Sequence, residues 1–123
     1  MKKIKIKFLR FSISVDLHNT ENAMQIWEAC PIKSIINTWG NEIYFDTKIN
    51  TIIDKTAKNI ISKGEIAFWV EGASIAIGFG PTPISKGNEI RLVTNANIIG
   101  VTVDNLSALS IVNSGEIVIV EQI

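Results

Sequence analysis

The sequence predicts a mainly β protein: a closed eight-stranded antiparallel β-barrel with one or two short helices capping its ends. Short apolar runs with a period of two recur along the 123 residues, and such alternation is typical of half-buried strands. Turn residues separate these runs about every ten residues. Closure would also remove exposed strand edges from a chain rich in isoleucine. We therefore expect a single domain, residues 1–123.

The composition argues against several classes of protein. Hydrophobic residues make up 46% of the chain and charged residues 20%, so disorder is not expected. Twelve basic and twelve acidic side chains cancel, which removes the electrostatic reason to expect nucleic acid or an acidic membrane as a partner. No apolar run approaches the roughly 20 residues of a membrane helix. With a single cysteine, Cys30, and no signal-peptide pattern, we expect a cytoplasmic protein.

The N-terminal segment predicts a β-hairpin. Apolar residues alternate with lysines over residues 3–8, and a second alternating run covers residues 11–16. The apolar phase changes between Phe8 and Phe11, which fits a tight turn at Leu9 and Arg10. We expect the lysines to lie on the solvated face of the first strand.

A short helix is expected next. His18, Asn19 and Thr20 supply N-cap chemistry, and Pro31 ends the helix because the residue before a proline is pushed out of the α region. The apolar face consists of Ala23, Ile26, Trp27 and Cys30. Such a helix suits the open end of a barrel.

The remaining elements are expected from similar patterns. They are strands at 32–39, 42–46, 98–103 and 117–120, an extended segment at 91–94, and a helix at 106–111 capped by Asp104. In the 42–46 strand, Ile43 and Phe45 share one face, and Glu42, Tyr44 and Asp46 share the other. We interpret the second face as a solvated strand face without placed metal ligands.

The chain is organised around a hairpin within residues 64–85. Two alternating runs join at a glycine turn, and Pro81 and Pro83 end the second run because proline cannot continue a strand ladder. One face of the first run carries Ile66, Phe68 and Val70, and should face the barrel core. Trp69 would then lie on the outer wall.

This outer wall is the candidate binding surface. Ala67, Ala76 and Gly78 should lie on it beside Trp69 as a shallow apolar floor. We predict that Trp69 is partly exposed and lines a concavity with Tyr44, Phe79 and Thr82, and these four are the candidate ligand-binding residues. Pro81 and Pro83 should fix a loop at one edge of this groove. The competing interpretation is that Trp39 and Trp69 simply pack beneath that loop.

Two motifs resemble those of a known family. They are Asn-Thr-Trp-Gly-Asn-Glu-Ile-Tyr-Phe at residues 37–45 and Gly-Pro-Thr-Pro-Ile-Ser at residues 80–85, with further resemblance at 64–69 and 97–100. The chain is similar over almost its whole length to small archaeal and bacterial proteins with a cyclophilin-like fold, largely of unknown function. The resemblance implies an eight-stranded closed barrel with helices at its ends. The chain departs from the family where Val70 and Glu71 replace frequent prolines.

No catalytic residue can be transferred from true cyclophilins. Their isomerase motifs are not found, and neither arginine, Arg10 or Arg91, lies in a matching motif. His18 and Cys30, the only imidazole and thiol, should lie at opposite ends of the helix and form no dyad. The sequence therefore indicates no catalytic residues, no metal ligands and no cofactor.

Three hypotheses for function remain. The leading one is a binding module whose outer aromatic groove takes an extended peptide or a small apolar ligand. The alternative is a weak peptidyl-prolyl cis-trans isomerase that lacks the usual groove arginine. The third is an interaction protein that forms a homodimer through the same surface.

Overall fold

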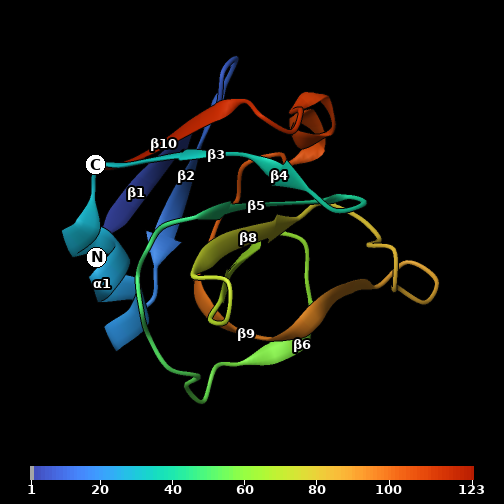
Figure 1. The fold of residues 1–123 in the computed structure, drawn as a ribbon, viewed down its shortest axis with the longest axis horizontal. Helices are drawn as coiled ribbons and strands as arrows, with labels where there is room; N and C mark the ends of the chain where they lie inside the picture. Colours follow the sequence, from blue (N-terminus) through green and yellow to red (C-terminus); the bar gives the residue numbers. More distant parts are fainter. Residues whose placement is uncertain (1) are drawn as a thin grey trace.

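The computed structural model describes residues 2–123 and shows a mainly antiparallel β structure (Figure 1). The strands over these residues are β1 (Lys3–Lys7), β2 (Ser12–Leu17), β3 (Ile32–Ile35), β4 (Asn37–Thr38), β5 (Glu42–Asp46), β6 (Lys58–Ile61), β7 (Glu65–Trp69), β8 (Ser74–Gly78), β9 (Ile90–Val101) and β10 (Ile117–Gln122). The helical elements are α1 (Glu21–Ala29) and the 3₁₀ helix η1 (Ser107–Ile111). The predicted mainly β class is confirmed.

The barrel closes at Ile36. The strands follow the order β3-β10-β1-β2-β9-β7-β8-β5-β4, so β3 and β4 lie at opposite ends of the path. These two strands are nevertheless consecutive in the chain, separated by Ile36. Because β3 pairs with β10 and β4 pairs with β5, one continuous segment joins both ends into a nearly closed barrel.

The number of strands differs from the expected eight. Ten strands are assigned within residues 2–123. The difference has two causes: β3 and β4 occupy one position around the barrel, and β6 lies off the closed path, where it pairs only with β9. The eight-position barrel predicted from the sequence therefore carries one additional strand outside it.

The N-terminal hairpin and the helix form as predicted. Ile4 and Ile6 are buried while the lysines between them are exposed, and the turn is held by the amide of Phe8 donating to the carbonyl of Phe11 at 2.8 Å. Thr20 caps α1 by accepting a hydrogen bond from the amide of Ala23 at 3.2 Å. The apolar face of α1 packs against the barrel core.

Strand β9 is the main departure from the prediction. It is one strand of 12 residues, where the sequence predicted separate segments at 91–94 and 98–103. Its second half pairs with β7 and its first half with β6, and the register is irregular on both sides. The curved path of β9 in Figure 1 carries its first half, together with β6, over the outer face of β7 and β8. A β-bulge bends a strand in this way.

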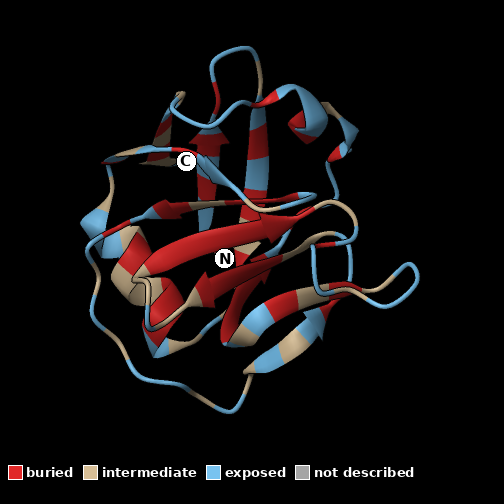
Figure 2. Cartoon of the chain, turned by 45° about the vertical axis from the view of Figure 1, so that its right-hand side comes forward, coloured by how far each residue is buried: buried red, intermediate tan, exposed pale blue. Residues whose placement is uncertain are grey.

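The outer face of β7 and β8 is therefore covered, and residues 2–123 form two hydrophobic cores. The larger core fills the barrel and includes Phe68, whereas the smaller core packs Ala67 and Ala76 beneath Leu92 and other residues of β6 and β9. Figure 2 shows the consequence as central strands that are buried along their length, unlike the alternating N-terminal strands. The expected open floor of small residues is thus wrong: the small residues are buried because their size lets another layer approach.

The second helix also differs from the expectation. Residues 107–111 form a 3₁₀ helix, and its first amide, Ser107, donates to the side chain of Asn105 rather than that of Asp104. The carboxylate of Asp104 instead accepts from the amide of Ser14 at 2.7 Å. Leu106 and Leu109 are buried. Among residues 2–123, no helix has the length and hydropathy to cross a membrane.

Asn97 fastens the long irregular segment between β5 and β6. Its buried side chain accepts from the amide of Asp54 at 2.9 Å and donates to the carbonyl of Ile52 at 3.0 Å. It also donates to the side chain of Asn22 in α1 at 3.1 Å. Three parts of the chain are therefore tied together by one amide.

Candidate ligand-binding site

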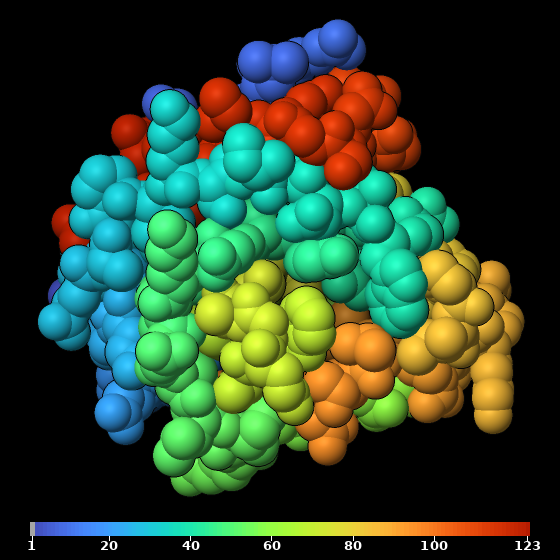
Figure 3. Space-filling model, viewed as in Figure 1, coloured from blue at the N-terminus to red at the C-terminus, as the bar shows by residue number. Residues whose placement is uncertain are grey.

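A cavity of about 200 Å³ lies between the outer face of the barrel and the first half of β9. Its lining residues are Trp39, Glu42, Tyr44, Trp69, Ala76, Leu92, Val93, Thr94 and Ala96. We call it the outer cavity. Three segments of the chain contribute these residues. Figure 3 shows them side by side on the face in view: residues around 40 in teal, residues around 70–76 in yellow-green, and residues 92–96 in orange.

Aromatic side chains form much of the cavity wall. The rings of Tyr44 and Trp69 meet edge to face, with centroids 5.9 Å apart and an interplanar angle of 88°. Trp69 also lies on Gly72, where a Cβ atom would come within 2.2 Å of its ring. Trp39 adds a third aromatic side chain, and all three are half-buried. The register prediction is confirmed, since Phe68 faces the core and Trp69 the outer wall.

Glu42 places a carboxyl group in this apolar surrounding. It lies on the same strand face as Tyr44, but only 7% of its surface is exposed. Its Oε1 atom is buried without a hydrogen-bond partner. Burial raises the pKa of the Glu42 carboxyl from its ordinary 4.5 to about 7. The expectation of a solvated face is therefore wrong for Glu42, which is buried and lines the same cavity as Leu92 and Val93 of β9.

The turn at Gly40 and Asn41 fixes the position of Glu42 and Trp39. Trp39 and Glu42 exchange backbone hydrogen bonds of 2.9 and 3.2 Å across this turn, in which Gly40 has a φ of +60°. A Cβ atom at Gly40 would lie 2.8 Å from Cδ of Pro83. The amide of Asn41 also donates to the carbonyl of Pro81 at 3.1 Å. Residues 79–85, which we call the proline loop, thus support this turn from one side.

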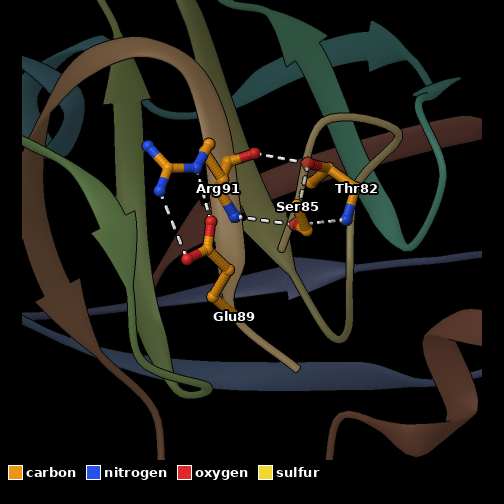
Figure 4. Close-up of polar contacts among 4 residues, drawn as sticks. All are labelled: Thr82, Ser85, Glu89 and Arg91. Carbon is orange, nitrogen blue, oxygen red and sulfur yellow. Dashed lines mark hydrogen bonds and ion pairs between the residues drawn. The ribbon is translucent and has the colours of Figure 1, made fainter. Parts of the chain in front are cut away.

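The same loop holds the opposite wall of the cavity. Figure 4 shows Ser85 accepting from the amide of Arg91 at 3.1 Å and Thr82 donating to the carbonyl of Arg91. Leu92 and Val93 follow directly and line the outer cavity. Residues 79–85 therefore connect the two walls and set the distance between them.

Comparison with known proteins establishes the family. The chain matches the family described as Cyclophilin-like over residues 2–121. It belongs to this family. The resemblance predicted from its motifs is confirmed. No curated protein matches the chain.

Two solved structures show how widely this cyclophilin-like fold varies in sequence. The hypothetical protein AF2241 from Archaeoglobus fulgidus is 35% identical, with a TM-score of 0.84 over 98% of this chain and 93% of that chain. The structure of McbB in complex with tryptophan is 17% identical, with a TM-score of 0.66 over 96% of this chain but 44% of that chain. At that identity the second likeness shows the fold alone.

The four residues predicted to bind a ligand fall into two groups. Tyr44 and Trp69 line the outer cavity, whereas Phe79 and Thr82 do not. Thr82 is buried and forms hydrogen bonds to Ser85 and Arg91. It therefore positions the β9 wall of the outer cavity and does not line the cavity itself. Phe79 packs against the barrel core and borders a separate cleft. Trp69 stays partly exposed, so the loop of Pro81 and Pro83 does not cover it completely.

The structure adds residues that sequence reasoning did not assign to the site. The competing interpretation placed Trp39 beneath the loop of Pro81 and Pro83, and Glu42 was assigned to a solvated face. The residues from β9 carried no signal, because nothing local to Leu92 or Val93 indicates which face of another strand they will cover. A signal for Glu42 was present, since it shares a strand face with Tyr44 at a spacing of two residues.

Other reactive groups lie away from the cavity. Burial, together with the charge of Glu121, raises the pKa of the Cys30 thiol to about 11, which keeps it protonated and weakly nucleophilic. The ring of His18 lies 3.4 Å from the carbonyl of Ile98. Within residues 2–123 no group of three or more histidine, cysteine or acidic residues is placed to hold a metal ion.

Proposed function

We propose that this protein is a binding module that holds a small, mainly apolar ligand in the outer cavity. The observation that carries the proposal is a concave site with three aromatic side chains and a buried carboxyl group. Ligand sites in proteins combine such apolar walls with a few placed polar groups. Half-buried tryptophans at an open site are also costly to leave in water unless a ligand covers them.

The size of the cavity limits what can enter it. Its volume is about 200 Å³, and an apolar protein cavity of about 150 Å³ can hold a benzene molecule. A single aromatic ring with a short substituent fits this space. An extended peptide would enter with one side chain only, so a small ligand is the better match of the two predicted occupants.

The isomerase alternative receives less support from the cavity. A twisted prolyl amide is stabilised best by a placed cation, and none of the described lining residues is cationic. The side chain of Arg91 forms an ion pair with Glu89, and Arg10 lies in the N-terminal turn. A prolyl-peptide isomerisation assay tests this directly: catalysis well above background would overturn the preference for a binding module.

Nuclear magnetic resonance can test binding with an internal control. The three tryptophans each give one indole N–H signal, and Trp27 lies in α1, away from the outer cavity. We expect titration with indole, phenol and benzyl alcohol to shift the signals of Trp39 and Trp69 and leave that of Trp27 unchanged. Trp69→Phe should weaken binding, whereas the matched variant Trp27→Phe should not.

Two results would contradict the proposal. If no compound in the set shifts Trp39 or Trp69, the cavity is not a ligand site for small aromatics. If both signals shift instead with protein concentration alone, the surface is a contact between copies of this chain, which is the homodimer hypothesis.

A further inference from the structure

The outer cavity holds an acidic group for which the described lining residues offer no counter-charge. Glu42 is the only ionisable acid among its lining residues, and its Oε1 atom is buried and unpaired. Tyr44 is the only other titratable side chain that lines the cavity from β5, β7, β8 or β9. No lysine or arginine from the described residues lines it, so the protein supplies no counter-charge there.

The unpaired carboxyl group has an identifiable origin. Glu42 pairs across the strands with Gly78, which offers no side chain to that face. Ile90 packs directly onto Gly78, where a Cβ atom would lie 2.4 Å from its Cγ2 atom. Strand β9 therefore packs an apolar side chain beside the Glu42 carboxyl group, and no hydrogen-bond donor reaches its Oε1 atom. Leaving a buried acceptor unsatisfied is unfavourable, and leaving a buried charge unpaired is more so.

We propose that the outer cavity recognises the ammonium group of a small amine, with Glu42 as its counter-ion and Trp39, Tyr44 and Trp69 as an aromatic cage around it. This inference rests on the proposed function and specifies its ligand class. An ammonium group supplies the carboxyl group of Glu42 with hydrogen-bond donors and with the counter-charge that the lining residues do not provide. It also gains from the negative faces of tryptophan and tyrosine rings, which attract ammonium groups.

A neutral ligand would satisfy the site only in part. A hydroxyl group can donate one hydrogen bond to the carboxylate of Glu42, but it leaves the carboxylate charge uncompensated. The ratio of the affinities for an amine and for a matching alcohol therefore measures how strongly the charge of Glu42 contributes to binding. Benzylamine and benzyl alcohol are suitable probes, because they share a ring and nearly the same size, and only the amine carries a positive charge near neutral pH.

The expected result is a preference that depends on Glu42. In the wild-type protein at about pH 8, benzylamine should bind roughly 10- to 100-fold more tightly than benzyl alcohol. In Glu42→Gln this preference should disappear, because the amide has no charge. Benzyl alcohol and benzylamine should bind Glu42→Gln with similar affinities, and circular dichroism together with an unchanged indole signal of Trp27 shows that the variant is folded.

The pH dependence gives a second test that needs no variant. Because the pKa of Glu42 is about 7 in the empty cavity, benzylamine should bind about tenfold more tightly at about pH 8 than at about pH 6. The affinity of benzyl alcohol should change little or fall over this range, since the protonated carboxyl group dominates at the lower pH. The shifts of the Trp39 and Trp69 signals report both titrations.

Each outcome bears on the inference. Equal affinities for the two probes, or a preference for the amine that persists in Glu42→Gln, would overturn amine recognition while leaving the binding module intact. Binding of benzyl alcohol without binding of benzylamine would do the same. If neither probe binds but indole or phenol does, the inference also fails, and the proposed function survives on those ligands.

Discussion

Replacing Glu42 by glutamine should stabilise the protein at alkaline pH and leave its stability almost unchanged at acid pH. Glutamine has nearly the same shape as a protonated glutamate and carries no charge at any pH. The free energy of unfolding of the wild-type protein should therefore depend on pH in a way that the variant does not share. Subtracting one from the other removes the contribution of every other titrating group.

The sign follows from the raised pKa. Below about pH 4.5 the Glu42 carboxyl is protonated in both the folded and the unfolded chain, so it does not disfavour folding. Between about pH 4.5 and pH 7 the unfolded chain releases this proton while the folded protein retains it, so the free energy of unfolding falls as pH rises. Above about pH 7 the carboxyl group is ionised in both the folded and the unfolded chain, so the free energy of unfolding falls no further on account of Glu42.

The magnitude follows from the same two values. A pKa raised from 4.5 to about 7 corresponds to about 3 kcal/mol, at roughly 1.4 kcal/mol for each tenfold change in proton affinity. We therefore expect the free energy of unfolding of Glu42→Gln to exceed that of the wild type by up to about 3 kcal/mol at about pH 8. At about pH 4 the difference should be less than about 0.5 kcal/mol. Urea unfolding followed by circular dichroism at both pH values measures this difference.

A matched control separates burial from a general effect of removing one negative charge. Glu71 lies in the exposed turn between β7 and β8, and Glu71→Gln should give the same small difference at both pH values. If Glu42→Gln behaves like Glu71→Gln, the carboxyl group of Glu42 has a partner or solvent in the folded protein. The reasoning from its burial would then be refuted, together with the main support for amine recognition.

Two further predictions concern the layers that surround the site. Asn97→Ala should cost about 2 kcal/mol and speed hydrogen exchange at the amide of Asp54, which donates to Asn97 at 2.9 Å; unchanged exchange there would contradict the anchoring role. Gly78→Ala should cost about 1–3 kcal/mol in urea unfolding, because its Cβ would meet Ile90 at 2.4 Å. A Gly78→Ala variant as stable as the wild type would show that the first half of β9 is not fixed against β8.

The alternation of apolar and polar residues, together with the turn and cap residues, was enough to predict several strands of the barrel, their inward faces and the first helix. The period-two pattern around Phe68 and Trp69 correctly assigned one ring to the core and the other to the outer wall. The N-terminal hairpin and the capped helix were predicted for the same reason. In each case the physical cause is local, since strand geometry alternates side chains between two faces and a cap needs only a polar side chain near the first turn.

Only the tertiary structure decided what lies on the outer wall. A period of two tells which residues share a face, but it does not tell whether solvent or another strand covers that face. Glu42 therefore looked solvated in the sequence, and Ala76 looked like an open floor. The bend in β9 brings residues about 15 to 50 positions away in the chain over Ala76 and into the cavity that the buried Glu42 lines. Such a contact depends on where the whole barrel closes, which no local pattern near Glu42 records.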